Sequence, residues 1–187
     1  MRRLILEGRS DPSVAQYAAQ VVAASPGVHP VEAVFNHVQA MPYAFDEKLL
    51  AEAGYGEDTS EFLQGASYQV EKSLLSGPQN VFGDCDDRAI LTQSLLESQG
   101  INTRLVLVRG PGRTDYSHVY SEAEVGGSWV PLDTIMDGKE GRPLFGPGEE
   151  AKLPLARDRM SVGINEEPGQ SKLIPLLLLA ALFFWRR

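Results

Sequence analysis

The chain has 187 residues, of which 43% are hydrophobic and 22% are charged, and this composition is typical of a globular protein with a substantial core. Its formal charge of −8 and the lack of a basic segment argue against a nucleic-acid partner. The single cysteine, Cys85, excludes an intramolecular disulfide and a multi-cysteine zinc site. The N-terminus is basic and then briefly apolar, but Glu7 and Arg9 interrupt it, so no secretory signal peptide is expected.

Apolar residues recur at helical spacing in three N-terminal segments bounded by capping residues, Pro or Gly: from Ser10 to Pro26, from Pro30 to Ala40 and from Ser60 to Gly77. Residues 43–58 hold scattered aromatic residues, acids and two glycines, which predicts a surface loop. We interpret the helices as packing elements. His29 and His37 lie among them, and neither has an obvious place beside the cysteine.

Cys85 stands where a turn gives way to the most apolar helix of the chain, predicted over about residues 84–98. At a helix start, the unpaired N–H groups and the positive end of the helix dipole favour a thiolate, the nucleophilic form of cysteine. Cys85 shares one stripe of this helix with Ala89 and Thr92, so the helix should be central, with the cysteine at its exposed end. A lone cysteine can also be a small buried hydrophobic residue, so the residues near Cys85 decide whether it is inert or a nucleophile.

Three strand signals follow, at residues 104–108, 117–125 and 128–133, and they predict an antiparallel meander. The two-residue turn Gly126-Gly127 would pair Val125 with Ser128. In that register His118 and Asp133 are diagonal neighbours with backbones roughly 7–8 Å apart, within reach of a side-chain hydrogen bond.

If the helix begun by Cys85 lies across the face of His118, a thiol, an imidazole and a carboxylate meet in the order nucleophile, base and orienter. The thiolate would attack a carbonyl carbon, His118 would take and return the proton, and Asp133 would hold the imidazole in the useful tautomer.

The acids around the cysteine have opposing effects. Asp84, Asp86 and Asp87 can cap the helix and interact with its dipole, whereas their negative charge opposes thiolate formation. A calcium loop would need a longer ligand series with a glycine turn, so no metal or cofactor is expected.

Three motifs occur in order at compatible spacings: GDCDD at residues 83–87, SHVY at 117–120 and WVPLD at 129–133. They resemble the core motifs of the transglutaminase-like superfamily, which has a papain-like fold, and the resemblance covers about residues 60–135. It implies that the Cys, His and Asp of these motifs form a triad for acyl transfer. The family includes transglutaminases, peptidases, amidases and peptide N-glycanases, so it restricts the reaction more than the substrate.

The resemblance to papain-like enzymes also indicates Gln79, six residues before Cys85, where those enzymes have a glutamine that donates to the oxyanion. The backbone N–H of Cys85 is a second candidate donor, which requires only the helix start. Tyr120 and Trp129 are candidates for lining the cleft, with ordinary hairpin packing as the alternative.

The C-terminal segment from Leu173 to Trp185 contains 13 consecutive uncharged residues, bracketed by Lys172 and by Arg186-Arg187. As a helix it would be roughly 20 Å long, against the roughly 30 Å hydrocarbon layer of a bilayer. Snorkelling basic ends and local thinning could accommodate it, so we expect lipid-membrane attachment through residues 173–185, with a buried core helix as the alternative.

The sequence therefore predicts an α+β protein with three parts: a papain-like, transglutaminase-like catalytic domain (1–150), a polar tether (151–171) and a short C-terminal hydrophobic membrane-anchor helix (172–187). In the catalytic domain, N-terminal helices and the central Cys-bearing helix should pack on the β-meander. The expected activity is that of a membrane-tethered cysteine hydrolase which cleaves an amide or isopeptide bond in a peptide, protein or peptidoglycan-like substrate, through a thioester acyl-enzyme. A protein cross-linking transglutaminase and a non-catalytic membrane-attached structural or binding protein remain alternatives, and a cellular and a virion membrane are equally compatible with the sequence.

Overall fold

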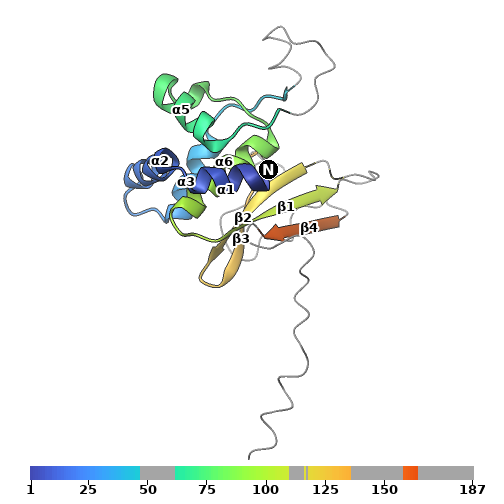
Figure 1. Cartoon of the computed structure of the whole chain (residues 1–187). Coiled ribbons are helices and arrows are strands. Elements are labelled where there is room, and N and C mark those ends of the chain that lie inside the picture. The colour runs from blue at the N-terminus through green and yellow to red at the C-terminus, as the bar shows by residue number, and fades with distance from the viewer. Residues whose placement is uncertain (47–61, 110–115, 117, 136–157, 164–187) are drawn as a thin grey trace, which may run out of the picture.

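The computed structural model describes residues 1–46, 62–109, 116, 118–135 and 158–163. In these residues, a group of helices packs beside one antiparallel sheet, which gives the predicted α+β architecture (Figure 1). The helices are α1 (Arg2–Arg9), α2 (Pro12–Ala23), α3 (Pro30–Gln39), α5 (Ala66–Ser76), the 3-10 helix η1 (Pro78–Asn80) and α6 (Cys85–Ser98). The strands are β1 (Thr103–Arg109), β2 (His118–Val125), β3 (Ser128–Leu132) and β4 (Asp158–Gly163).

The N-terminal helices begin at residues suited to that position. The side chain of Asp11 accepts a hydrogen bond from Ser13 N at 2.8 Å and caps α2, and Pro12 occupies the first helical position. His29 caps α3 in the same way, with its ring accepting from Val31 N. Helix α1, which was not predicted, packs against α6 and buries Ile5.

Helix α5 begins at residue 66 rather than at the predicted residue 60. The backbone N–H groups that precede it serve tertiary contacts instead of a helical turn. Phe62 N donates to the carboxylate of Asp46, and Gln64 N donates to Asp87 Oδ1 at 2.6 Å. The start of this helix is therefore fixed by acids that are distant in sequence.

Helix α6 is the central element, as predicted. It packs against α1, α2, α3 and α5 and against strands β1 and β2, and all its residues from 86 to 96 are buried. Polar side chains connect it to the sheet: Gln93 Nε2 donates to Ser121 Oγ at 3.2 Å, and Thr103 Oγ1 donates to Gln93 Oε1 at 3.1 Å. Packing on several sides explains why the sequence of this helix lacks a polar face.

The sheet has the strand order β3-β2-β1-β4, and all its pairings are antiparallel. The hairpin register is confirmed, because Val125 pairs with Ser128 across a Gly126-Gly127 turn whose residues both have positive φ. Strand β4 is a difference from the prediction, since residues 158–163 lie within the segment expected to be a tether. Its sequence, DRMSVG, carries little strand propensity, and the strand depends on pairing with β1.

The predicted membrane-anchor helix (172–187) lies outside the described residues. Within the part of the chain that the structure describes, no helix has the length and apolar character needed to cross a bilayer.

Candidate active site

Cys85 is the first residue of α6 and is partly exposed. Asp84 caps the helix, and its side chain accepts a hydrogen bond from Asp86 N at 3.3 Å. The residue before the cap must be small: a Cβ added to Gly83 would lie 2.8 Å from Asp87 Cβ and 2.9 Å from Asp87 Oδ2. The glycine thus allows the backbone before the cysteine to approach the first turn of the helix.

A buried hydrogen-bond network of Gln64, Gln69 and Asp87 holds the backbone before Cys85 against the first turn of α6. Both oxygens of Asp87 accept hydrogen bonds from Gln64, one from its backbone N and one from its Nε2, each at 2.6 Å. Gln64 Nε2 also donates to Phe82 O at 2.9 Å, and Gln69 Nε2 donates to Gln64 O and Asp87 O, both at 3.0 Å. Neither glutamine was predicted as a site residue, because neither belongs to a recognisable motif.

His118 and Asp133 lie together as the hairpin register predicts. Nε2 of His118 is 2.7 Å from Asp133 Oδ2, and the histidine side chain is 21% exposed whereas that of the aspartate is 1% exposed. Asp133 directly follows β3, and its Oδ1 accepts a hydrogen bond from Ile135 N at 3.2 Å. The Tyr120 ring stacks on the His118 ring with centroids 6.1 Å apart. The imidazole is therefore held on one nitrogen and one face.

The thiol of Cys85 lies close enough to His118 to influence the pKa of its imidazole. Burial alone would lower the pKa of His118, but the hydrogen bonds to Asp133 and Cys85 and the charges of both outweigh it and raise the pKa to about 9. The structure thus brings together the three residues singled out in the sequence, from the start of α6, the start of β2 and the end of β3.

Arg88 lies one turn into α6 from Cys85, and only 4% of it is exposed. Its Nη1 donates to Thr134 O at 2.7 Å, and its Nη2 donates to Met41 O. Its guanidinium also lies 5.4 Å from the ring centroid of Tyr43. The side chain of Arg88 thus connects α6 with the backbone next to Asp133 and with the segment after α3.

The remaining site candidates, Gln79, Tyr120 and Trp129, lie at three different places. Gln79 lies on η1, is exposed and donates from its side-chain amide to Ser76 O at 3.3 Å, so in this structure that amide contacts the end of α5. Tyr120 is only 2% exposed and packs with Val106 and Val108, which agrees with the hairpin-packing alternative.

Trp129, the other candidate for lining the cleft, is partly buried. The guanidinium of Arg104 lies 4.4 Å from the centroid of its ring, and that guanidinium also pairs with the buried Glu122. Of the two remaining histidines, His37 makes a 2.9 Å hydrogen bond with Tyr17 Oη, within the helical group.

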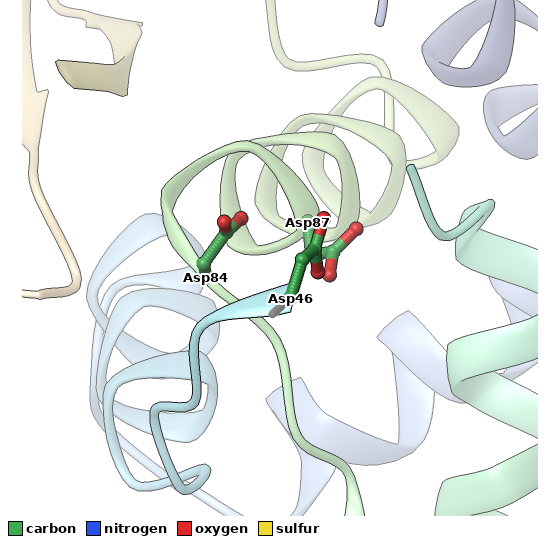
Figure 2. A group of neighbouring side chains, drawn as sticks. All are labelled: Asp46, Asp84 and Asp87. Carbon is green, nitrogen blue, oxygen red and sulfur yellow. The ribbon is translucent and has the colours of Figure 1, made fainter. Parts of the chain in front are cut away.

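Three carboxylates gather at the start of α6: Asp46, Asp84 and Asp87 (Figure 2). Each offers an oxygen within 4.8 Å of the others, so these are the described residues that could hold a cation. Burial raises the pKa of Asp87 to about 7, and the charges of Asp84 and Asp46 add to this whereas the hydrogen bonds from Gln64 oppose it. Both oxygens of Asp87 already accept hydrogen bonds from Gln64, and the expected absence of a metal stays a prediction.

The sequence matches the family model described as the transglutaminase-like superfamily over residues 16–134, and it matches no curated protein. Similar solved structures include a candidate cysteine protease from Cytophaga hutchinsonii, at 14% identity over 85% of this chain and 53% of that chain, with a TM-score of 0.44. Another is Rad4-Rad23 bound to a 6-4 photoproduct UV lesion, at 10% identity over 83% of this chain and 42% of that chain, with a TM-score of 0.42. The chain therefore spans about half the length of these solved chains.

Proposed function

The chain belongs to the transglutaminase-like superfamily, and on that premise we propose that it is a cysteine hydrolase that cleaves an amide or isopeptide bond with Cys85 as nucleophile. One observation carries the proposal: His118 makes a 2.7 Å hydrogen bond with the buried carboxylate of Asp133, and Cys85 lies close enough to raise the pKa of the same imidazole. This is the arrangement in which a base activates a nucleophile while a third group orients the base.

The raised pKa of His118 supports a role as a proton donor. At neutral pH a histidine with a pKa of about 9 is protonated, and its hydrogen bond to the buried carboxylate of Asp133 stabilises that form. In acylation, Cys85 Sγ would bond to the carbonyl carbon, and His118 would give its proton to the leaving amine as the C–N bond breaks. In deacylation, His118 would take a proton from water, whose oxygen attacks the thioester, and would return that proton to the sulfur.

This chemistry identifies the type of bond that is cleaved, but several classes of substrate contain that bond. A peptide, a protein or a peptidoglycan-like polymer offers an amide or isopeptide carbonyl that a thiolate can attack. We favour hydrolysis over cross-linking, because we assign no second site for an amine acceptor among the described residues. The product distinguishes the two: H₂¹⁸O would label the new carboxylate in hydrolysis, whereas a fluorescent amine would be incorporated in transamidation.

Alkylation kinetics test the triad and separate an enzyme from a non-catalytic scaffold. Iodoacetamide should modify Cys85 of the wild type at pH 6, and His118→Ala should slow this reaction. The matched control is His29→Asn, which replaces a histidine outside the site by another good helix cap. Equal rates for the wild type and His118→Ala would contradict the triad.

We also propose that residues 172–187 attach this domain to a membrane, with their uncharged run and basic flanks as the support. Flotation with lipid vesicles compares the full chain with a variant that ends at residue 171. The truncated protein should stay in solution and keep its thiol reactivity, whereas aggregation of the truncated protein would indicate that the segment is part of the core.

A further inference from the structure

Tyr43 lies beside the segment that leads into the nucleophile. It forms an isolated parallel bridge with Gly83, and Ala44 N donates to Gly83 O at 3.3 Å. Figure 2 shows the continuation of the same segment at Asp46, lying against the first turn of α6. These backbone contacts hold Tyr43 beside Gly83, which lies two residues before Cys85.

Two contacts hold the aromatic ring of Tyr43. The guanidinium of Arg88 lies 5.4 Å from its centroid, and that guanidinium is itself fixed by the carbonyls of Thr134 and Met41. The ring of Phe45 meets it edge to face, with centroids 5.1 Å apart and planes at 85°. Tyr43 is nevertheless 37% exposed, so its position is fixed while part of its side chain remains accessible to a substrate.

The hydroxyl of Tyr43 stays protonated throughout the neutral range. Burial raises the pKa of Tyr43 to about 12, the negative charges of Cys85, Asp84 and Asp86 add to the rise, and Arg88 opposes it. The bridge to Gly83 and the contact with Arg88 place the ring beside the first turn of α6, which begins at Cys85. A neutral phenol there is a hydrogen-bond donor with no tendency to give up its proton.

The site lacks a side-chain oxyanion donor from the expected source, because the Gln79 amide contacts Ser76 O in this structure. The backbone N–H of Cys85 points out of the first turn of α6 and has no acceptor within the helix, so it can supply one donor. A tetrahedral intermediate is better stabilised by two preorganised donors than by one.

We propose that the hydroxyl of Tyr43 is this second donor and hydrogen-bonds to the oxyanion that forms on the substrate carbonyl. The inference rests on the proposed function. As Cys85 Sγ bonds to the carbonyl carbon, the π pair of the C=O bond moves to the oxygen, which accepts hydrogen bonds from Tyr43 Oη and Cys85 N. When the leaving group departs, the pair returns to re-form C=O, and Tyr43 keeps its proton throughout. Arg88 acts as a positioning residue for the ring.

Tyr43→Phe isolates the hydroxyl, since phenylalanine keeps the ring that contacts Arg88 and Phe45. Two reactions of Cys85 are compared: acylation by p-nitrophenyl acetate, which forms an oxyanion, and alkylation by iodoacetamide, which does not. The variant should lose acylation rate by about 10²-fold, as for removal of one oxyanion donor, and should alkylate within about twofold of the wild type. The matched control, Tyr68→Phe on α5, should leave both rates unchanged.

A loss of acylation smaller than tenfold overturns the inference, and so does an equal loss of both reactions, because Tyr43 would then act on the thiol itself. Cys85→Ser distinguishes a failure of the proposed function from a failure of the inference about Tyr43. If wild type and Cys85→Ser release p-nitrophenolate at the same rate, the proposed function fails, and the inference fails with it. If the release depends on Cys85 but not on the Tyr43 hydroxyl, only the inference fails.

Discussion

Asp133 Oδ2 accepts a hydrogen bond of 2.7 Å from His118 Nε2 across the diagonal of the β2-β3 hairpin. The carboxylate is almost fully buried, whereas the imidazole is partly exposed and lies close enough to Cys85 for the thiol to influence its pKa. The pair therefore has one buried end that fixes orientation and one accessible end that can exchange protons with a substrate.

Replacement of Asp133 by asparagine should lower the pKa of His118. Burial, the largest influence on this histidine, disfavours its charged form, and Asp133 is a main source of the opposing effect. In Asp133→Asn, the pKa should fall from about 9 toward the ordinary value near 6.5. The NMR titration of the imidazole C–H resonances measures this, with His29 and His37 as internal references, and an unchanged value would show that Asp133 does not control the proton.

The same histidine should make the stability of the protein depend on pH. Its pKa is about 9 in the folded state and about 6.5 when unfolded, so the folded state favours the protonated form. The resulting stabilisation is fully present below pH 6.5 and is lost as the pH rises through 9, with a limit of about 3 kcal/mol. Urea denaturation at pH 6 and pH 9.5 should show this loss in the wild type. His118→Gln should show a smaller dependence over the same interval, and equal dependences would contradict the assignment.

The sequence and the structure agree where local chemistry determines the conformation. The hairpin register followed from Gly126-Gly127, because a two-residue turn with positive φ at both positions fixes which residues are opposed. The start of α6 followed from the capping side chain of Asp84. From the hairpin register alone, the meeting of His118 with Asp133 was predictable.

The differences occur where distant residues meet. Residues 60–65 carry helical signals, but Asp46 and Asp87 bind the backbone N–H groups of that segment and delay the start of α5. Strand β4 depends on β1 in the same way. Arg88 is visible in the sequence as a charge in an apolar helix, yet its acceptors, the carbonyls of Met41 and Thr134, are known only once the chain has folded. Neither the periodicity of apolar residues nor a sequence motif indicates these contacts between distant residues.

Asp84→Asn should stabilise the protein above pH 7 and leave it unchanged near pH 4. Asp87 has a pKa of about 7 when folded and about 3.8 when unfolded, so its contribution to stability is greatest below pH 3.8 and is lost as the pH rises to 7. Removal of the like charge at residue 84 should reduce that loss, and asparagine caps a helix as well as aspartate does. Urea denaturation measures the gain, expected at about 1 kcal/mol.

The control for this prediction is Asp11→Asn, which changes the cap of α2 in the same way. Hydrogen bonds from Ser67 and Ser13 lower the pKa of Asp11, so its negative charge is stabilising and its removal should decrease stability at pH 7. Opposite signs for the two variants would support the burial of Asp87, whereas a loss of stability in both would contradict it.

Gly83→Ala should destabilise the fold and slow the reactions of Cys85. The new Cβ would lie 2.8 Å from Asp87 Cβ and 2.9 Å from Asp87 Oδ2, and Asp87 cannot rotate away without breaking its two hydrogen bonds to Gln64. Relief of the clash must move either the backbone before Cys85 or the first turn of α6, at a cost of about 1–3 kcal/mol. Gly65→Ala is the matched control, because its new Cβ would only approach Leu4 Cδ2 at 3.7 Å. Denaturation curves and iodoacetamide kinetics should show a clearly larger effect at residue 83, and equal effects at the two positions would contradict this account of the glycine.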